Sequence, residues 1–202
     1  MTTKTRCPWL PFDKGDQLYI KYNDKEWGVP VFSDKKLYEF LVLEAFQAGL
    51  SWRTVLYKRE NFRKVFAGFD PKKVSKFSNL QVKKLMNNAG IIRNRLKILA
   101  AIENAKQFLK VQKEFGSFAK YQWGFVKGKP IVHKLKSLRD YPVSIKEAEA
   151  MARDMKKRGF KFLGPTVLYA HMQACGMVND HIVTCFRHKK IARTPPLKIR
   201  GG

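Results

Sequence analysis

Apolar positions recur along most of the chain at the three- and four-residue spacing of helices, and polar capping residues mark where each helix begins. Ser33 precedes one such run, which extends to Ala48, and Gly49 follows it at the position that favours a left-handed backbone. Ser51 offers a cap for the next helix, which we expect over residues 52–66. The pattern predicts two consecutive helices joined by a tight turn.

The remainder of the chain carries the same helix signals, and strand signals are nearly absent. Residues 125–132 could form a small hairpin, but Pro130 lacks the N–H that a ladder needs and favours a loop. We predict an all-α protein with one domain over residues 1–188, built from N- and C-terminal portions, and a basic, disordered tail over 189–202. The later helices are expected after Asp70-Pro71, from a capping box at Ser78 to near Gly90, over 93–115, from a second capping box at Ser144 to Gly159, over 166–175, and after Asn179-Asp180.

Composition and charge narrow the function. The chain has 202 residues, 45% of them hydrophobic, so it can form a core and is not disordered as a whole. Lysine and arginine number 41 against 16 acidic residues, and the net charge of +25 favours a polyanionic partner. The 15 Phe, 7 Tyr and 4 Trp could stack on bases. The alternative is a cationic surface that serves solubility, with the rings in the core.

Cysteine usage and the lack of long apolar runs bear on the compartment. Cys7, Cys175 and Cys185 are too few and too scattered for a disulfide framework. No stretch approaches the roughly 20 apolar residues that span a bilayer, and the N-terminus lacks the apolar block of a signal peptide. We expect a soluble intracellular protein in a reducing compartment, with no membrane partner.

Glu44 stands at a position of its helix where an apolar residue is expected. It continues the stripe formed by Leu37, Phe40, Leu41, Ala45 and Ala48, so its carboxylate faces inward. Burial of an unpaired carboxylate is costly, so Glu44 requires a partner, a raised pKa or a cavity. A structural ion pair is one explanation. The other is a base-binding pocket, which the neighbouring Gln47, Trp52, Tyr19, Tyr22 and Trp27 favour because a carboxylate, an amide and rings can read and stack a purine.

Two helix junctions combine glycine with basic residues. Residues 156–170 contain a basic helix end, a short apolar hairpin, Gly164 and a new helix start. Gly164 permits close approach of a phosphate to the backbone, and the N–H groups of the next helix point outward. Residues 87–95 resemble this junction, with Gly90 followed by Arg93 and Arg95. We expect both to contact a DNA backbone, with Lys157 and Arg158 contributing charge; ordinary solvated helix ends are the alternative.

Several segments together are similar to those of the DNA-3-methyladenine glycosylase I family. The resemblance runs from about Cys7 to Cys185. The matching segments are Cys7-Pro8-Trp9, Asp24-Lys25-Glu26-Trp27-Gly28-Val29-Pro30, Leu43-Glu44, Gln47-Ala48-Gly49-Leu50-Ser51-Trp52, Arg59-Glu60-Asn61, Gly90-Ile91-Ile92-Arg93, Lys157-Arg158-Gly159-Phe160-Lys161-Phe162-Leu163-Gly164 and Met172-Gln173-Ala174-Cys175-Gly176-Met177-Val178-Asn179-Asp180-His181.

The resemblance implies a helix-hairpin-helix fold and a monofunctional enzyme that removes 3-methyladenine from alkylated double-stranded DNA. It implies that Glu44 serves catalysis and that the substrate base meets Tyr19, Tyr22 and Trp52, to which we add Gln47. The expected DNA-binding residues are Arg93, Lys161, Gly164 and Thr166. We expect a monomer that flips the damaged nucleotide and hydrolyses its glycosidic bond.

The family also carries a structural zinc held by Cys, His, His and Cys. Three of these positions match, namely Cys7, His181 and Cys185, whereas Asn23 stands where the family has its other histidine. Three ligands plus water, or a carboxylate such as Asp24, could still hold the ion. Two buried cysteines and a hydrogen-bonded histidine without metal are the alternative. We expect zinc because three ligands remain.

Three other hypotheses stay open at this point. A helix-hairpin-helix protein could grip damaged DNA without cleaving it, and charge alone would also suit an RNA-binding protein. Asp180 follows the hairpin at a distance that suits a general base in other helix-hairpin-helix glycosylases. We instead expect Asp180 to cap the final short helix.

Overall fold

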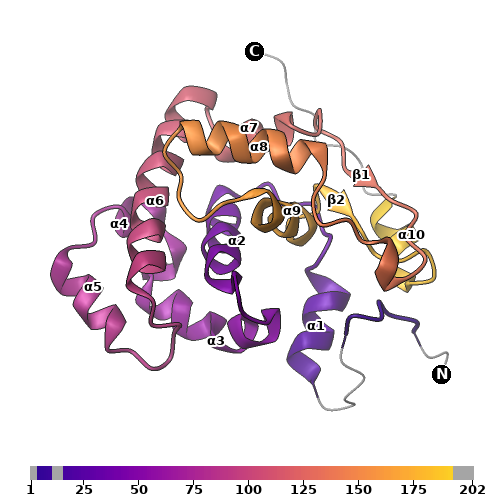
Figure 1. Cartoon of the computed structure of the whole chain (residues 1–202), viewed down its shortest axis with the longest axis horizontal. Helices are drawn as coiled ribbons and strands as arrows, with labels where there is room; N and C mark the ends of the chain where they lie inside the picture. The colour runs from indigo at the N-terminus through magenta and orange to yellow at the C-terminus, as the bar shows by residue number, and fades with distance from the viewer. Residues whose placement is uncertain (1–3, 11–15, 193–202) are drawn as a thin grey trace.

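The computed structural model describes residues 4–10 and 16–192, and helices make up most of this part of the chain (Figure 1). The long helices are α1 (Gln17–Lys25), α2 (Asp34–Gln47), α3 (Trp52–Val65), α5 (Asn79–Met86), α6 (Arg95–Phe115), α8 (Lys146–Lys157) and α9 (Pro165–Ala174). The shorter elements are η1 (Ala67–Phe69), α4 (Pro71–Val74), α7 (Phe118–Gly124), β1 (Ile131–Val132), η2 (Leu138–Asp140), β2 (Val178–Asn179) and α10 (Phe186–Ala192). The prediction of an all-α fold is confirmed.

Helix α2 is the centre of the fold. It packs against α3, α6, α7 and α9, and Figure 1 shows it surrounded by later helices. Every residue from Leu37 to Phe46 is buried. The sequence pattern predicted one buried stripe on this helix, whereas the surrounding helices bury all its faces. Such a helix holds its side chains rigidly, which suits it to position a functional group.

Most predicted helix boundaries are confirmed. Ser51 caps α3 and Ser78 forms the predicted capping box of α5. Gly49 has φ of +80°, the left-handed conformation expected after α2, and only glycine adopts it without strain. Two of these helices are shorter than predicted, because α5 ends at Met86 rather than near Gly90 and α6 begins at Arg95 with Asn94 as its cap.

Two predicted features near the C-terminus are wrong. The capping box expected at Ser144 does not form, because Ile145 occupies the N-cap of α8 with no side-chain cap bond. The short helix expected directly after Asp180 begins only at Phe186, so Asp180 caps no helix. Helix α10 continues to Ala192 and therefore includes the first residues of the segment predicted as a disordered tail. Residues 193–202 of that segment lie outside the described part.

Residues 125–132 form no hairpin, as expected, but the last two of them make β1. This strand pairs in parallel with β2, Ile131 opposite Val178 and Val132 opposite Asn179. The partner is far away in the sequence, so no local signal could reveal the pairing. Within residues 4–10 and 16–192, no helix is long and apolar enough to cross a membrane.

The N-terminal segment packs on the C-terminal part of the chain. Backbone hydrogen bonds of 3.0 Å run from Gly28 N–H to the Gln173 carbonyl, from Val31 N–H to the Cys175 carbonyl and from Phe186 N–H to the Thr5 carbonyl. Residues that precede α2 and residues that follow α9 thereby form one wall beside the central helices.

Candidate active site

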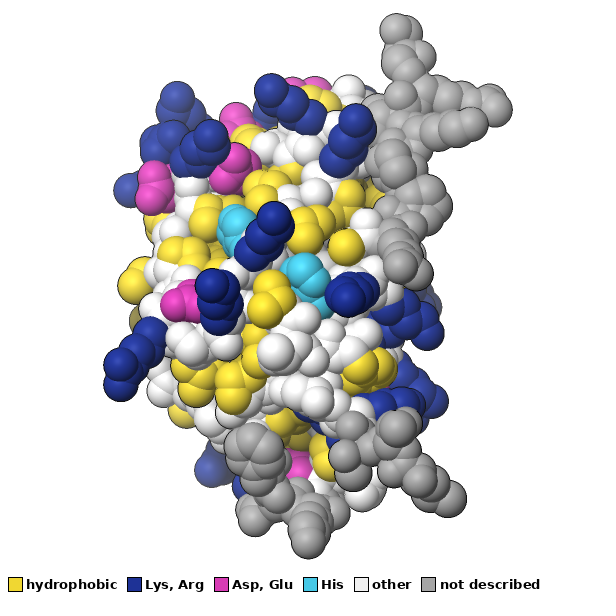
Figure 2. Space-filling view, turned by 90° about the vertical axis from the view of Figure 1, so that its right-hand side faces the viewer, with side chains coloured by type: hydrophobic (Ala, Val, Ile, Leu, Met, Phe, Trp, Pro, Cys, Tyr) yellow, Lys and Arg dark blue, Asp and Glu magenta, His cyan; other side chains and the backbone are white. Residues whose placement is uncertain are grey.

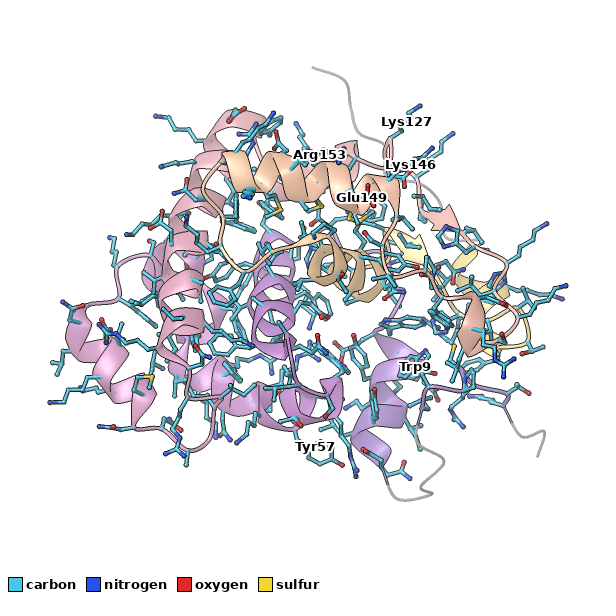
Figure 3. The ribbon with its side chains drawn as sticks, in the orientation of Figure 1. Trp9, Tyr57, Lys127, Lys146, Glu149 and Arg153 are labelled. Carbon is cyan, nitrogen blue, oxygen red and sulfur yellow. The ribbon has the colours of Figure 1, made fainter. Side chains whose placement is uncertain are left out.

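A pocket of about 360 Å³ lies between helices α1, α2 and α9 and the N-terminal segment. It is lined by Trp9, Tyr19, Tyr22, Trp27, Glu44, Gln47, Trp52, Leu138, Tyr141, Ala170 and Gln173. The five residues expected to contact a base, Glu44, Tyr19, Tyr22, Gln47 and Trp52, therefore line one cavity. Trp9, which Figure 3 shows beside α1, closes it from the N-terminal side.

Glu44 is the one lining carboxylate, and it is only 4% exposed. Among the described residues, no side chain or backbone group gives it a hydrogen bond or an ion pair. Burial raises the pKa of Glu44 from its ordinary 4.5 to about 8. In the free protein the group is therefore mostly protonated at neutral pH. The pocket thus contains an acid that gains its missing partner only when a cationic or hydrogen-bonding ligand enters.

The structural ion pair weighed for Glu44 occurs instead at Glu39, five positions earlier on α2. Glu39 accepts from Arg59 at 2.7 Å and from Arg63 at 2.6 Å, and Lys36 lies 3.2 Å away. Burial opposes ionisation of Glu39, but these cations outweigh it and lower its pKa. Two buried acids on one helix therefore have opposite environments. Only Glu44 has the environment of a binding-site residue.

Aromatic rings form the walls of the pocket. Tyr22 lies 5.1 Å from Trp52, and Trp9 lies 5.5 Å from Tyr19, measured between ring centroids. The indole N–H groups of Trp9 and Trp52 are buried and have no hydrogen-bond partner within residues 4–10 and 16–192. Gln47 donates through Nε2 to the Leu50 carbonyl at 2.7 Å, which fixes its amide at the rim. Such walls can stack on a flat ring and offer donors at its edge.

The pocket is also lined by residues that sequence reasoning did not assign to the site, chiefly Gln173 and Tyr141. Gln173 donates through Nε2 to the buried Asp180 carboxylate at 2.7 Å. Tyr141 donates to the Asp180 backbone carbonyl at 2.8 Å. Tyr169 and His133 also hydrogen-bond the Asp180 carboxylate. No local pattern marks these residues, because a loop and a distant helix contribute them.

Asp180 therefore has a different role from the helix cap that we expected. Its side chain is wholly buried, and its two carboxylate oxygens bind three side chains rather than backbone N–H groups. Tertiary contacts decide this role, because a wholly buried carboxylate needs hydrogen-bond donors, and His133, Tyr169 and Gln173 supply them from other elements. The network orients Gln173 at the edge of the pocket.

The hairpin between α8 and α9 contains three of the predicted DNA contacts, Lys161, Gly164 and Thr166, and all three are exposed. Gly164 is the N-cap of α9 and has no capping side chain, and Pro165 has no N–H. The backbone N–H of Thr166 is therefore free to bind an anion. A Cβ on Gly164 would meet no protein atom within 4 Å, and its φ of −73° suits any residue. The protein's own fold therefore does not require glycine at position 164. We infer that glycine there leaves room for an external group to approach the backbone.

The hairpin is fixed to α6 and shares a groove with it. Asn104 accepts from the Lys161 N–H at 2.7 Å and donates to the Lys161 carbonyl at 2.9 Å. Leu96 and Phe162 line the groove between α6 and the hairpin. Arg93 is exposed just before α6, three positions ahead of the groove residue Leu96.

Not every basic residue near the hairpin is free for a ligand. Arg158 pairs with Glu114 at 2.6 Å and Asp154 at 2.7 Å, so these acids already engage its guanidinium; its expected contribution to DNA contact stays a prediction. Figure 3 shows Lys146, Glu149 and Arg153 along the outer side of α8, away from the buried Ala148 and Met151. On the face shown in Figure 2, lysine and arginine side chains are spread among uncharged ones with few acidic groups. The positive charge is therefore distributed and not confined to one junction.

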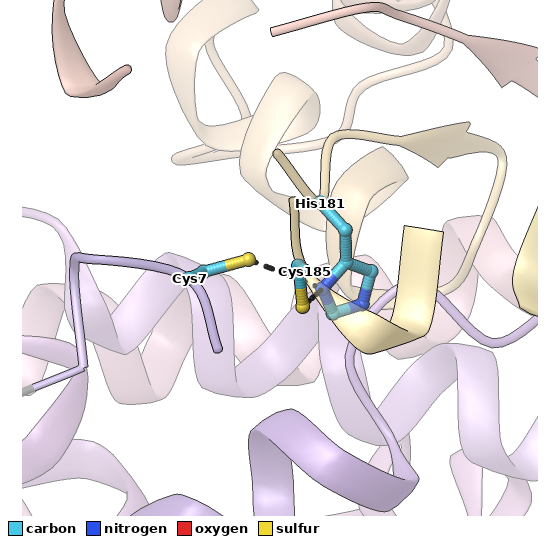
Figure 4. Close-up of side chains that lie close together, drawn as sticks. All are labelled: Cys7, His181 and Cys185. Atoms are coloured by element: carbon cyan, nitrogen blue, oxygen red, sulfur yellow. Dashed lines mark hydrogen bonds between the residues drawn. The ribbon is translucent and has the colours of Figure 1, made fainter. Parts of the chain in front are cut away.

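Cys7, His181 and Cys185 form a buried cluster whose ligand atoms lie within 4.8 Å of one another (Figure 4). His181 Nδ1 lies 3.2 Å from Cys7 Sγ and 3.4 Å from Cys185 Sγ. His181 Nε2 lies 3.1 Å from the Trp27 carbonyl, which directs Nδ1 toward the sulfurs. The hydrogen bond from Cys7 lowers the pKa of the Cys185 thiol despite its burial.

Two details of this cluster differ from expectation. Residues 181–185 were expected as a helix but form a turn before α10, closed by a bond from Cys185 N–H to the Ile182 carbonyl at 2.8 Å. Asp24, considered as a substitute ligand, is held by Arg6 through two bonds of 2.8 Å and is no member of the cluster. The three predicted ligands therefore come together, and the possible substitute Asp24 does not join them.

An all-α fold with a hairpin between α8 and α9 and an acid in an aromatic pocket defines a helix-hairpin-helix DNA glycosylase fold. The model of the methyladenine glycosylase family matches residues 12–188, and the chain belongs to this family. It is 47% identical over 182 residues to the DNA-3-methyladenine glycosylase of Haemophilus influenzae, covering 90% of this chain and 96% of that protein. It is 48% identical over 180 residues to DNA-3-methyladenine glycosylase 1 of Escherichia coli, covering 89% and 95%.

Solved structures agree with this assignment. A crystal structure of 3-methyladenine DNA glycosylase I superposes with a TM-score of 0.87 at 48% identity, covering 91% of this chain and all of that one. A variant of such an enzyme in complex with 3-methyladenine superposes with a TM-score of 0.84 at 33% identity, covering 88% of this chain and 95% of that one.

Proposed function

We propose that this protein is a monofunctional DNA glycosylase that flips a 3-methyladenine nucleotide out of alkylated DNA and hydrolyses its glycosidic bond in base excision repair. The observation that carries the proposal is Glu44, a buried acid without a partner in an aromatic pocket of about 360 Å³. The relative whose structure holds 3-methyladenine shares this fold. A pocket of this kind suits one flat, positively charged base.

The chemistry follows from the charge of the lesion. Methylation at N3 makes the nucleoside base cationic and labile, so the glycosidic electrons can leave with the base and neutralise it. Glu44, ionised beside this cation, accepts a hydrogen bond from the exocyclic amine, and the ring faces of Tyr22 and Trp52 stack on the base. Water adds to the sugar carbon and loses a proton to solvent. Unmodified adenine has no positive charge and therefore gains less from Glu44.

The protein would hold double-stranded DNA through two junctions. Lys161, Gly164 and Thr166 on the hairpin and Arg93 before α6 are exposed and suited to phosphate oxygens. The remaining positive charge of this chain favours sequence-independent contact during search. We propose that the protein acts as a monomer in the bacterial cytoplasm, bound to the nucleoid.

Cys7, His181 and Cys185 would hold a structural zinc ion. Tetrahedral zinc with these ligands spaces its donors about 3.5–3.8 Å apart. His181 Nδ1 lies 3.2 and 3.4 Å from the two sulfurs, so the three donors need to move apart only slightly to hold the ion. Zinc at this place would contribute stability, because it ties the N-terminal segment to the turn before α10. The same segment places Trp9 at the pocket.

Methylated duplex DNA, analysed for released bases by chromatography, tests the proposed activity. We expect the wild-type protein to release free 3-methyladenine. If it binds the DNA but releases no base, the protein is a binder and not an enzyme. Tighter binding to structured RNA than to duplex DNA in competition would favour the RNA-binding alternative.

A further inference from the structure

Asn23 is a wholly buried polar residue on α1 with no hydrogen-bond partner. Its side chain is 0% exposed, and neither Oδ1 nor Nδ2 makes a hydrogen bond with the described residues. Buried amides are nearly always satisfied, and those that are not deserve a physical explanation, such as a bound ion. Both polar atoms of one side chain lack partners here, which makes Asn23 the most conspicuous such residue in the interior.

The surroundings of Asn23 indicate what it binds. Its amide lies close enough to the Cys7 thiol to favour the thiolate, although outside hydrogen-bond geometry, and Cys7 is part of the cluster with His181 and Cys185. The neighbouring carboxylate of Asp24 is taken up by Arg6. Asn23 thus adds an unused oxygen donor to a group that already contains two sulfurs and one imidazole nitrogen.

We propose that Asn23 Oδ1 is the fourth ligand of this metal site, so that the chain holds its ion with two thiolates, one imidazole and one amide oxygen. The inference rests on the zinc site proposed above and adds the ligand that completes it. Two thiolates neutralise the charge of Zn²⁺, so a neutral fourth ligand suffices. When Oδ1 faces the ion, Nδ2 is left to donate to the Cys7 sulfur, and both orphaned atoms of the amide gain partners.

An amide oxygen is a weaker zinc ligand than imidazole, because zinc prefers nitrogen and sulfur donors. The site in this chain should therefore bind and release its ion more readily than one with histidine at position 23. Release would loosen the segment that carries Cys7 and Trp9. Because Trp9 lines the pocket, its fluorescence should change when the metal is removed.

Titration with Co²⁺ tests the assignment of Asn23. Protein purified without a histidine tag is stripped with a chelator and titrated with Co²⁺, whose visible absorption reports tetrahedral thiolate ligation, and Zn²⁺ affinity is then measured against a chromophoric chelator. The variants are Asn23→Leu, which removes the oxygen at similar size, and Asn23→His. Cys175→Ala is the matched control, since Cys175 is buried but lies outside the cluster.

We expect Asn23→Leu to bind at least about tenfold more weakly, because even residues behind the ligands account for 10–100-fold in metal affinity. Asn23→His should bind more tightly than wild type, with shifted absorption bands, and Cys175→Ala should match wild type. Thermal melting confirms that each variant folds.

Two outcomes would overturn the proposal and are distinguishable. If wild type and Asn23→Leu bind Co²⁺ and Zn²⁺ equally well, a zinc site exists but Asn23 is not a ligand. If wild type binds neither ion, the inference fails whether or not Asn23→His restores binding. Neither outcome bears on base release, which is measured separately on the same proteins.

Discussion

The unpartnered state of Glu44 has a consequence for stability that can be measured without any substrate. Its pKa is about 8 in the folded protein and about 4.5 when the chain unfolds. Between these values the folded state retains a proton that the unfolded state has lost, so stability falls as pH rises from about 4.5 to about 8. The free energy of unfolding falls by about 1.4 kcal/mol per pH unit in this range, and by about 5 kcal/mol over the whole range. Glutamine cannot ionise, so the Glu44→Gln variant should lack this contribution to the pH dependence of stability.

Urea unfolding of wild type and Glu44→Gln between pH 5 and pH 8 measures this difference. We expect Glu44→Gln to gain stability relative to wild type steadily over that range, by roughly 4 kcal/mol in total. Glu39→Gln is the matched control on the same helix, because Glu39 is ion-paired with Arg59 and Arg63. That variant should lose about 3–5 kcal/mol with little dependence on pH. Parallel stability curves for wild type and Glu44→Gln would refute the reasoning, since they would mean that Glu44 is ionised and paired in the fold.

Three further predictions concern the hairpin and Asp180, which hydrogen-bonds the pocket residue Gln173. Gly164→Ala should leave the melting temperature nearly unchanged, because the new Cβ meets no protein atom within 4 Å. The same variant should bind duplex DNA more weakly in fluorescence anisotropy, and unchanged affinity would mean that no phosphate approaches Gly164. Lys161→Ala should weaken binding equally for different sequences and lower the slope of log affinity against log salt by about 1, whereas a sequence-dependent loss would contradict a backbone contact. Asp180→Asn should destabilise the fold by about 2–4 kcal/mol in urea unfolding, because three side chains hydrogen-bond the Asp180 carboxylate. A variant with wild-type stability that no longer releases the base would instead give Asp180 a role in catalysis.

The sequence was informative where a residue conflicts with its local pattern. Glu44 was found because it interrupts an apolar stripe, and Gly49 and Ser51 were found because turn and cap chemistry is local. Glu39 is as buried as Glu44, yet the pattern placed it outside the stripe. The pattern could not show that α2 is covered on every side, since that depends on four other helices.

The missed part of the site depends on contacts across the chain. Gln173 and Tyr141 line the pocket because both hydrogen-bond Asp180: Gln173 donates to its carboxylate, and Tyr141 donates to its backbone carbonyl. The three residues come from different parts of the chain. Asp180 was predicted to cap a helix from a local signal, whereas in the structure its buried carboxylate hydrogen-bonds three side chains from other elements. Asn23 was noted only as a departure from the family, and its burial without a partner is visible only in the structure.

Single-turnover release of 3-methyladenine from methylated duplex DNA tests the central claim most directly. Wild type and Glu44→Gln are compared at saturating protein, with Glu60→Gln, an exposed glutamate, as the control. A hydrogen bond to a charged group contributes about 1.5–3 kcal/mol, so Glu44→Gln should release the base roughly 10- to 150-fold more slowly. Equal rates for wild type and Glu44→Gln would contradict the account, because the buried acid would then play no part in removing the base.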